Sequence, residues 1–252
     1  MIRKLCRSAL VVAGIGAATA AGVAVGETVQ VGNLILTADA SFKPTTLPKN
    51  EMAPISLSVE AHVATQDGAI PPIAKSVVID FDKNGTVVTK GVDTCDPKKL
   101  QNTTTSQAKK KCKSAIVGSG ETRAIIDFPD QEPFEARGPL VAFNGKPQGK
   151  NPMIVLHVLA NVPLPTTFVV PAPITRSPKS GFGKRLTAQI PPIAGGNGTL
   201  TDFDVTIDKK PATGKEYLLA RCKDKKFDAE AQVTMLSGEQ LNLSVVRDCK
   251  PK

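Results

Sequence analysis

The sequence predicts an all-β protein, built as an antiparallel β-sandwich or open barrel with one short helical excursion between Cys95 and Cys112. Apolar and polar residues alternate with a period of two in at least five segments, which is typical of half-buried strands. Turn-forming residues separate these segments at roughly ten-residue spacing, as in sandwiches and barrels. Helix-capping signals gather only between the two cysteines.

The alternation places apolar side chains on one face of each predicted strand and polar side chains on the other. It is clearest in the segments 55–64, 77–82, 202–208, 227–235 and 241–245. The runs 153–160 and 168–170 are apolar at consecutive positions, which is typical of strands covered on both faces. A helix is predicted after Asp96-Pro97, with Ser106 as the cap of a second helical stretch that extends to Ala115.

The first 26 residues have the organisation of a secretory signal peptide. Basic residues at the start precede an apolar run of small residues, and the polar stretch opens at Glu27. We expect cleavage before Glu27, with cleavage after Ala24 as a second option. An uncleaved membrane anchor is the competing interpretation, because the run approaches the length of a membrane helix. Cleavage would leave a secreted or envelope-associated chain with no stable membrane span.

Residues 27–252 show no composition shift and no long linker, so we expect a single domain. With 41% apolar and 22% charged residues, the composition excludes intrinsic disorder and a polytopic membrane protein. The formal charge of +9 favours loose attraction to anionic polymers of a cell envelope. No aromatic-rich basic patch or nucleic-acid-binding motif is present, so we expect no nucleic-acid partner.

The cysteines agree with export. Cys6 lies in the expected signal peptide, and four cysteines remain for structural disulfides: Cys95, Cys112, Cys222 and Cys249. Four cysteines allow three pairings, and the sequence does not choose among them. The pairing of sequence neighbours joins Cys95 to Cys112 and Cys222 to Cys249. A zinc site would need CxxC-type spacing or nearby histidines, so we predict no metal and no cofactor.

A bridge between Cys222 and Cys249 restricts the C-terminal strands. In a flat meander of residues 216–222, 226–235 and 240–248, these cysteines would lie two strand spacings apart, roughly 10 Å. A disulfide needs Cα atoms about 5.5–6 Å apart. We expect the bridge, and therefore expect that the first strand pairs elsewhere or that the last residues bend back.

One segment resembles the first half of a calcium-binding EF-hand loop: Asp80-Phe-Asp82-Lys-Asn84-Gly85. The twelfth position of such a loop, where a bidentate carboxylate is needed, is Gly91. Strand-like residues also stand where the flanking helices should be. An Asn-Gly hairpin turn with outward aspartates explains the segment instead.

Residues suited to catalysis are few, and we predict no catalytic residue. His62 lies on the polar face of its strand, whereas His157 lies in an apolar run and is interpreted as a hydrogen-bonded core histidine. Gly118-Ser119-Gly120 lacks the spacing of a GxSxG nucleophile elbow. Asp202 and Asp204 fall on one outer strand face, whereas glycosidase carboxylates face each other across a cleft.

The strongest charge cluster consists of Lys109, Lys110, Lys111 and Lys113. We interpret it as the solvated face of the predicted helix. The functional alternative is docking to an anionic envelope polymer.

The order of these features resembles a group of secreted, β-rich actinobacterial proteins with two cysteine pairs. The similarity covers most of the chain after the signal peptide. It rests on Ala53-Pro54, the acidic Pro-Pro segment 67–72, Val77–Asp82, Ile116–Gly120, Tyr217–Cys222 and Arg247-Asp-Cys249. The resemblance implies the β-rich fold and the disulfides, and it implies no activity.

We therefore expect an exported, non-catalytic binding or structural module in the cell envelope or outside the cell. The alternative is a secreted ligand carrier, or a hydrolase whose site is assembled from loops. An apolar internal cavity of roughly several hundred Å³ would favour the carrier. Converging carboxylates with shifted pKa values, or a buried His–Ser pair, would favour the hydrolase.

Overall fold

The computed structural model describes residues 26–161, 164–208 and 216–252. Strands make up 61% of the structure and helices 7%, so the prediction of an all-β protein is confirmed. The strands of the main sheet are β1 (Glu27–Val31), β2 (Leu34–Lys43), β5 (Ser56–Thr65), β6 (Ala74–Asp82), β8 (Ile116–Ile126), β9 (Phe134–Gln148), β10 (Asn151–Ala160), β11 (Thr166–Arg176), β12 (Phe182–Gln189), β13 (Gly198–Ile207), β15 (Lys226–Met235) and β16 (Gln240–Asp248).

The remaining elements are short. The other strands are β3 (Thr46–Leu47), β4 (Ala53–Pro54), β7 (Gly85–Val87), β14 (Leu218–Ala220) and β17 (Lys250–Pro251). The helical elements are η1 (Pro97–Lys99), α1 (Thr105–Lys111), η2 (Lys113–Ala115) and η3 (Ala194–Gly196). The helical excursion therefore lies between Cys95 and Cys112, as predicted, and continues through η2.

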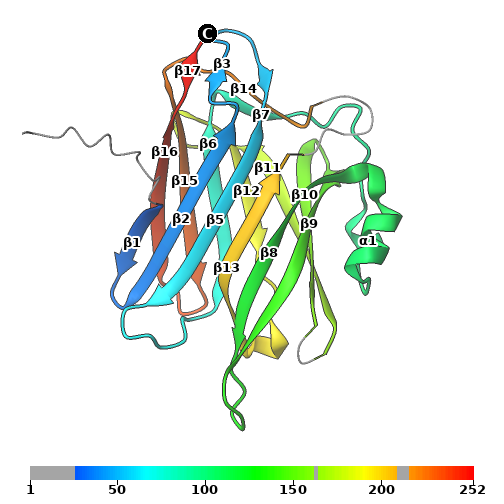
Figure 1. Cartoon of the computed structure of the whole chain (residues 1–252), viewed down its shortest axis with the longest axis vertical. Helices are drawn as coiled ribbons and strands as arrows, with labels where there is room; N and C mark the ends of the chain where they lie inside the picture. Colours follow the sequence, from blue (N-terminus) through cyan, green and yellow to red (C-terminus); the bar gives the residue numbers. More distant parts are fainter. Residues whose placement is uncertain (1–25, 162–163, 209–215) are drawn as a thin grey trace, which may run out of the picture.

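The described residues form a twelve-stranded antiparallel sheet in the order β1-β2-β5-β13-β8-β9-β10-β11-β12-β6-β15-β16 (Figure 1). Its last strand, β16, contacts β1 and β2 at the other edge, so the sheet is nearly closed on itself. Of the two predicted arrangements, this sheet corresponds to the open barrel. It encloses an interior that its inward-facing side chains line.

The two edges of the sheet meet along a seam between β1 and β16. Each edge strand has one hydrogen-bonded neighbour in the sheet, β2 for β1 and β15 for β16. Apolar side chains pack across the seam, including Leu36 and Leu243. At the seam, Arg247 of β16 donates part-buried hydrogen bonds to Glu27 and Asp39, with 2.9 Å from Nη2 to Glu27 Oε2. These bonds lower the pKa of Glu27 and raise that of Arg247.

The two ends of the sheet differ. The upper end in Figure 1 carries the C-terminus and a small sheet in the order β4-β14-β7. The lower end is formed by the turn and loop segments 32–33, 66–73, 127–133, 190–197 and 236–239. Segments 66–73 and 190–197 connect strands that are not neighbours in the main sheet, and the other three connect neighbouring strands. We use "upper end" and "lower end" in this sense below.

The prediction of a hairpin at Asn84-Gly85 is wrong, because the flanking strands do not pair with each other, although the turn itself is present. β6 ends at Asp82 and belongs to the main sheet, whereas β7 begins at Gly85 and pairs with β14 in the small sheet. The turn therefore passes the chain from one sheet to the other. A local pattern identifies a turn, but partners distant in sequence decide whether the flanking strands pair with each other.

Both disulfides join sequence neighbours. The Cα atoms lie 5.6 Å apart in Cys95–Cys112 and 5.8 Å apart in Cys222–Cys249. β14, which precedes Cys222, pairs with β4 and β7 rather than with β15. The expectation that this strand pairs elsewhere is confirmed, and the flat meander does not form.

α1 begins two residues earlier than the sequence predicts. Thr104 rather than Ser106 is the N-cap, because its hydroxyl accepts a hydrogen bond from Gln107 N and the Gln107 side chain accepts one from Thr104 N. This reciprocal pair is a capping box. The prediction that Asp96 and Pro97 start a helical turn is confirmed, because the Asp96 side chain caps η1 and accepts a hydrogen bond of 2.9 Å from Lys98 N.

The N-terminal predictions lie largely outside the described residues. The expected signal peptide covers residues 1–26, and of these, as of the alternative membrane anchor, residues 1–25 lie outside the described part of the chain. Within the part of the chain that the structure describes, no helix combines the length and the apolar character needed to cross a membrane. β1 begins at Glu27, the residue at which the mature chain is expected to start.

Candidate functional site

The inner face of the nearly closed sheet is apolar because the period-two pattern has the same phase on neighbouring strands. On β5, Val59 and Ala61 face the interior, and Glu60 faces outward. β13 pairs in register, with Val205 opposite Val59 and Asp204 opposite Glu60. Alternation along each strand and matching register between strands together build one continuous apolar wall.

This wall borders a cavity of about 290 Å³. Many lining side chains are only half-buried although they point inward, whereas side chains in a filled core would be buried. They come from β2, β5, β6, β8 to β13 and β15. Representative members are Val59, Ala61, Ile79, Leu156, Phe168 and Phe203.

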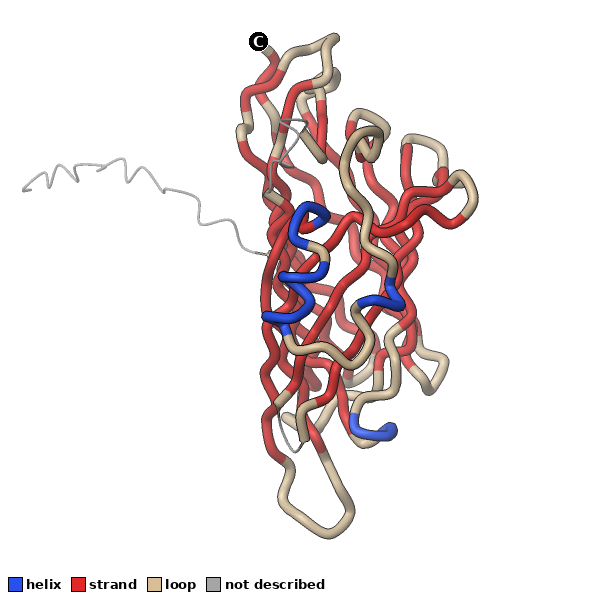
Figure 2. The backbone as a smooth tube through the Cα atoms, turned by 90° about the vertical axis from the view of Figure 1, so that its right-hand side faces the viewer, coloured by secondary structure: helices blue, strands red, loops and turns tan. Residues whose placement is uncertain are grey.

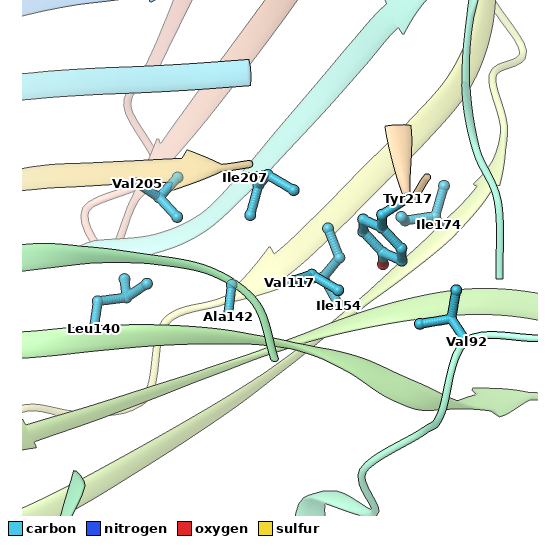
Figure 3. Close-up of a cluster of buried hydrophobic side chains, with 9 residues drawn as sticks. All are labelled: Val92, Val117, Leu140, Ala142, Ile154, Ile174, Val205, Ile207 and Tyr217. Carbon is cyan, nitrogen blue, oxygen red and sulfur yellow. The ribbon is translucent and has the colours of Figure 1, made fainter. Parts of the chain in front are cut away.

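Buried side chains close the upper end of the interior (Figure 3). Tyr217, immediately before β14, packs with Val92, Val117 and Ile174 in one apolar cluster. The Tyr217 hydroxyl has no hydrogen-bond partner in the described part of the chain, and burial raises its pKa. The cluster adjoins cavity residues such as Ile154, so the cavity ends against a packed apolar cap.

The lower end is less completely covered. Lining residues there include Ala160, Ile190 and Ala194, which are partly buried, and Thr166, which is exposed. Leu164, in the loop between β10 and β11, is 72% exposed. The lower end therefore offers the more accessible route into the cavity.

The cavity lining has little polar character. Its polar members are Thr122, Thr166, Thr201 and Asp202, and Asp202 also faces the outer surface through its bond to His62. The described lining includes no Lys, Arg or His. An anionic group buried among these residues would lack a compensating charge, so the cavity suits a neutral apolar molecule.

Glycines on β8 permit the close approach of β13. A Cβ atom added at Gly120 would lie 1.9 Å from the carbonyl oxygen of Asp204, and one added at Gly118 would lie 2.2 Å from that of Thr206. These contacts are with backbone atoms, which cannot rotate away. Gly118-Ser119-Gly120 is therefore a structural segment that shapes the wall of the cavity.

His62 lies on the outer face, as predicted, above a groove of about 550 Å³. Its Nδ1 lies 2.8 Å from Asp202 Oδ1, and Arg123 Nε lies 3.6 Å from the other oxygen of Asp202. Asp204 lines the same groove, which confirms that the two aspartates share an outer face. Exposed charges pair with one another here, and such pairs contribute little to stability.

His157 is fully buried, and it fastens the helical excursion to the sheet. It faces outward from β10, beneath the loop before α1, and its Nε2 lies 3.0 Å from the carbonyl oxygen of Thr103. Since a carbonyl only accepts, Nε2 carries the proton. Thr167 also donates to this carbonyl, at 2.8 Å. The interpretation of His157 as a hydrogen-bonded core histidine is confirmed.

We expect His157 to make stability depend on pH. Burial lowers its pKa below the ordinary 6.5, so between the two pKa values the unfolded chain binds more protons than the folded chain. The stabilisation of the folded state by neutral His157 is therefore fully present above pH 6.5. This part of the free energy of unfolding is lost as the pH falls below that value. Urea unfolding between pH 7.5 and 5 should show a steeper loss in the wild type than in His157→Gln. Identical pH profiles would contradict this assignment.

Asp80 and Asp82 do not converge. Arg185 donates two bonds to buried Asp80, Nε to Oδ1 at 2.8 Å and Nη2 to Oδ2 at 2.7 Å, and lowers its pKa. Asp82 accepts a bond of 2.6 Å from Asn84 N within the turn, while burial raises the pKa of Asp82. One carboxylate forms an ion pair and the other stabilises a turn.

Sequence reasoning did not identify the cavity residues. A usable signal was the frequency of alanine at inward positions, as in Ala61, Ala124, Ala136 and Ala231, because such small side chains cannot fill the interior of so wide a sheet. Recognising this signal requires knowing how many strands surround the interior. That number depends on pairings between segments distant in sequence.

Comparisons with known proteins give little guidance. No family model matches the chain, and no curated protein matches it. Among solved structures, the chain is similar to AvmM, described as catalysing macrocyclization in alchivemycin A biosynthesis. The identity is 9% and the TM-score 0.26, over 90% of this chain and 98% of that chain. Similarity at this level supports no statement about activity.

Proposed function

We propose that this protein is an exported, non-catalytic binding protein that carries a neutral apolar molecule inside its sheet. The observation that carries the proposal is the apolar cavity of about 290 Å³, close to the smallest volumes found for small-molecule sites. Apolar cavities of about half this size already bind small apolar molecules. The cavity favours a ligand carrier over a purely structural module or a hydrolase.

The shape and surroundings of the cavity support this proposal. Its upper end is packed with apolar side chains, and its lower end is the more accessible. An elongated apolar molecule entering from below would gain contacts with Val59, Leu156 and Phe203 and would remove their exposed surface from water. The two disulfides are consistent with an oxidising extracellular environment, which agrees with export.

The hydrolase alternative has less support. Asp80 and Asp82, two neighbouring carboxylates with shifted pKa values, have separate partners and do not share a site. The Thr103 hydroxyl lies 3.1 Å from His157 Nε2, and both residues are buried. Neither arrangement faces the cavity, so the carrier remains the function that we propose.

Filling the cavity tests this proposal. Ala61→Phe places a large side chain in the cavity, so we expect at least tenfold weaker binding of a neutral fluorescent probe such as N-phenyl-1-naphthylamine. The same change should leave stability unaltered or raise it by about 0.5–2 kcal/mol, as cavity-filling substitutions do. Fluorescence titration and urea unfolding measure the two effects.

Ser244→Phe is the matched control, because Ser244 is exposed on the outer face of β16. It should bind the probe as the wild type does. Ala231→Phe, on β15, fills the cavity from another wall and should repeat the effect of Ala61→Phe. Equal probe binding by all four proteins, or no binding by the wild type, would overturn the carrier proposal.

A further inference from the structure

The helical excursion presents a group of exposed lysines that the cavity does not explain. We call this group the lysine platform; it consists of Lys98, Lys99, Lys109, Lys110, Lys111 and Lys113. The excursion, residues 95–115, contains one carboxylate, Asp96, whose side chain caps η1. Six positive charges within so short a segment repel one another, so the fold must hold them together.

The base of the platform is rigid. Leu100, Ala108 and Ala115 are buried against side chains of β9 and β10, including Phe143 and Val155. The Cys95–Cys112 disulfide closes the excursion, and His157 binds it to the sheet from below. Figure 2 shows the excursion as a separate layer over the strands. The lysines therefore project from a fixed surface rather than from a mobile loop.

The charges of the molecule are unevenly distributed. The five lower-end segments defined above contain no Lys or Arg. They carry five carboxylates: Asp67, Asp127, Asp130, Glu132 and Glu239. An extended anionic surface would attract the platform and repel the lower end, so it would select one orientation of the molecule.

The chemistry of the platform favours a lipid surface over a polymer chain. Proteins that bind single-stranded nucleic acid, an anionic polymer, use a positively charged groove and aromatic residues that contact successive units. Residues 95–115 contain no aromatic side chain, and no platform lysine lines the cavity or the outer groove. Clusters of four to eight basic residues are typical of sites that bind anionic lipids, and each basic residue near the membrane surface contributes about 1 kcal/mol of attraction.

We infer that the lysine platform docks this protein peripherally on an anionic phospholipid bilayer. The docking goes beyond the carrier function and does not depend on it, because the platform lies outside the sheet. Bound in this way, the side wall formed by β9 and β10 faces the bilayer, because the platform covers the outer face of these strands.

Co-sedimentation with vesicles tests this inference, using protein purified after export. Wild-type protein should bind vesicles of phosphatidylglycerol and phosphatidylcholine in equal parts, and should not bind phosphatidylcholine alone. Replacing Lys98, Lys99, Lys109 and Lys110 with Gln should weaken binding at least fiftyfold, since each lysine accounts for about a fivefold change. Raising the salt concentration to about 1 M should abolish wild-type binding.

A second quadruple variant separates the platform from net charge. Lys75, Lys226, Lys250 and Lys252 are exposed on other parts of the molecule. Their replacement with Gln removes the same charge and should change vesicle binding by less than threefold. Near-ultraviolet circular dichroism verifies that both variants remain folded.

Three outcomes would overturn the inference. They are absence of binding to the anionic vesicles, equal weakening by the two quadruple variants, and tighter binding per phosphate to soluble poly(glycerol phosphate) than to the vesicles. The last outcome would assign the platform to an envelope polymer. Probe binding by the platform variant should match that of the wild type, so failure of docking and failure of the carrier proposal are distinguishable.

Discussion

Cys249→Ser is expected to lower the free energy of unfolding by roughly 2–5 kcal/mol. The bridge to Cys222 closes a sequence separation of 27 residues and fixes the C-terminus to the upper end. Both cysteines are buried, in one cluster with Phe42 and Leu47. Beside them, β17 pairs with β3, so the loss of the bridge would also loosen this parallel contact. Urea unfolding under non-reducing conditions measures the change.

The effect of the bridge should not be additive across its two ends. Cys222→Ser should lower the free energy of unfolding by as much as Cys249→Ser does. The double variant should lower it by no more than either single variant, because all three remove the same bond. Peptide mapping should find Cys222 linked to Cys249. A change below about 0.5 kcal/mol, or a link from Cys222 to Cys95, would contradict the assignment.

Gly120→Ala is the second substitution with a large expected effect, at least about 3 kcal/mol of destabilisation. The new Cβ would lie 1.9 Å from the backbone oxygen of Asp204, and relief would require β8 and β13 to separate. Overpacking against side chains costs about 1–3 kcal/mol, and a fixed backbone atom leaves less room to adjust. Thermal and urea unfolding both report the loss.

Gly85→Ala is the matched control for this substitution. A Cβ at Gly85 would meet its nearest atom, Asp82 O, at 3.7 Å, which is an ordinary contact. We expect its stability to stay within about 0.5 kcal/mol of the wild type. If Gly120→Ala were equally well tolerated, β13 could not approach β8 as closely as described.

The strands were largely predictable from the sequence, whereas their partners were not. Period-two alternation identified β5, β13, β15 and β16, because a sheet with one face toward the interior imposes that period. The two-sided run of β10 was also predictable, since the excursion covers its outer face. Register and order depend on contacts between distant segments. The Asn84-Gly85 hairpin was wrong for this reason.

The candidate site was less accessible to sequence reasoning than the fold. Most residues of the cavity are ordinary inward-facing strand residues with apolar side chains, which carry no reactive chemistry. A filled core and a lined cavity use the same residue types, and they differ only in whether side-chain volume matches the enclosed volume. His157 was interpretable because a polar residue within an apolar run needs a partner. Its partner, Thr103, was not predictable, because it comes from a loop.

Native mass spectrometry of the exported protein tests the central claim most directly. We expect wild-type protein, after incubation with an excess of a long-chain alcohol, to carry about one neutral molecule per chain, which is released on denaturation. Ala61→Phe should carry none, and Ser244→Phe should behave as the wild type does. A wild-type mass equal to that of the polypeptide alone, or uptake that Ala61→Phe leaves unchanged, would contradict a carrier function located in this cavity.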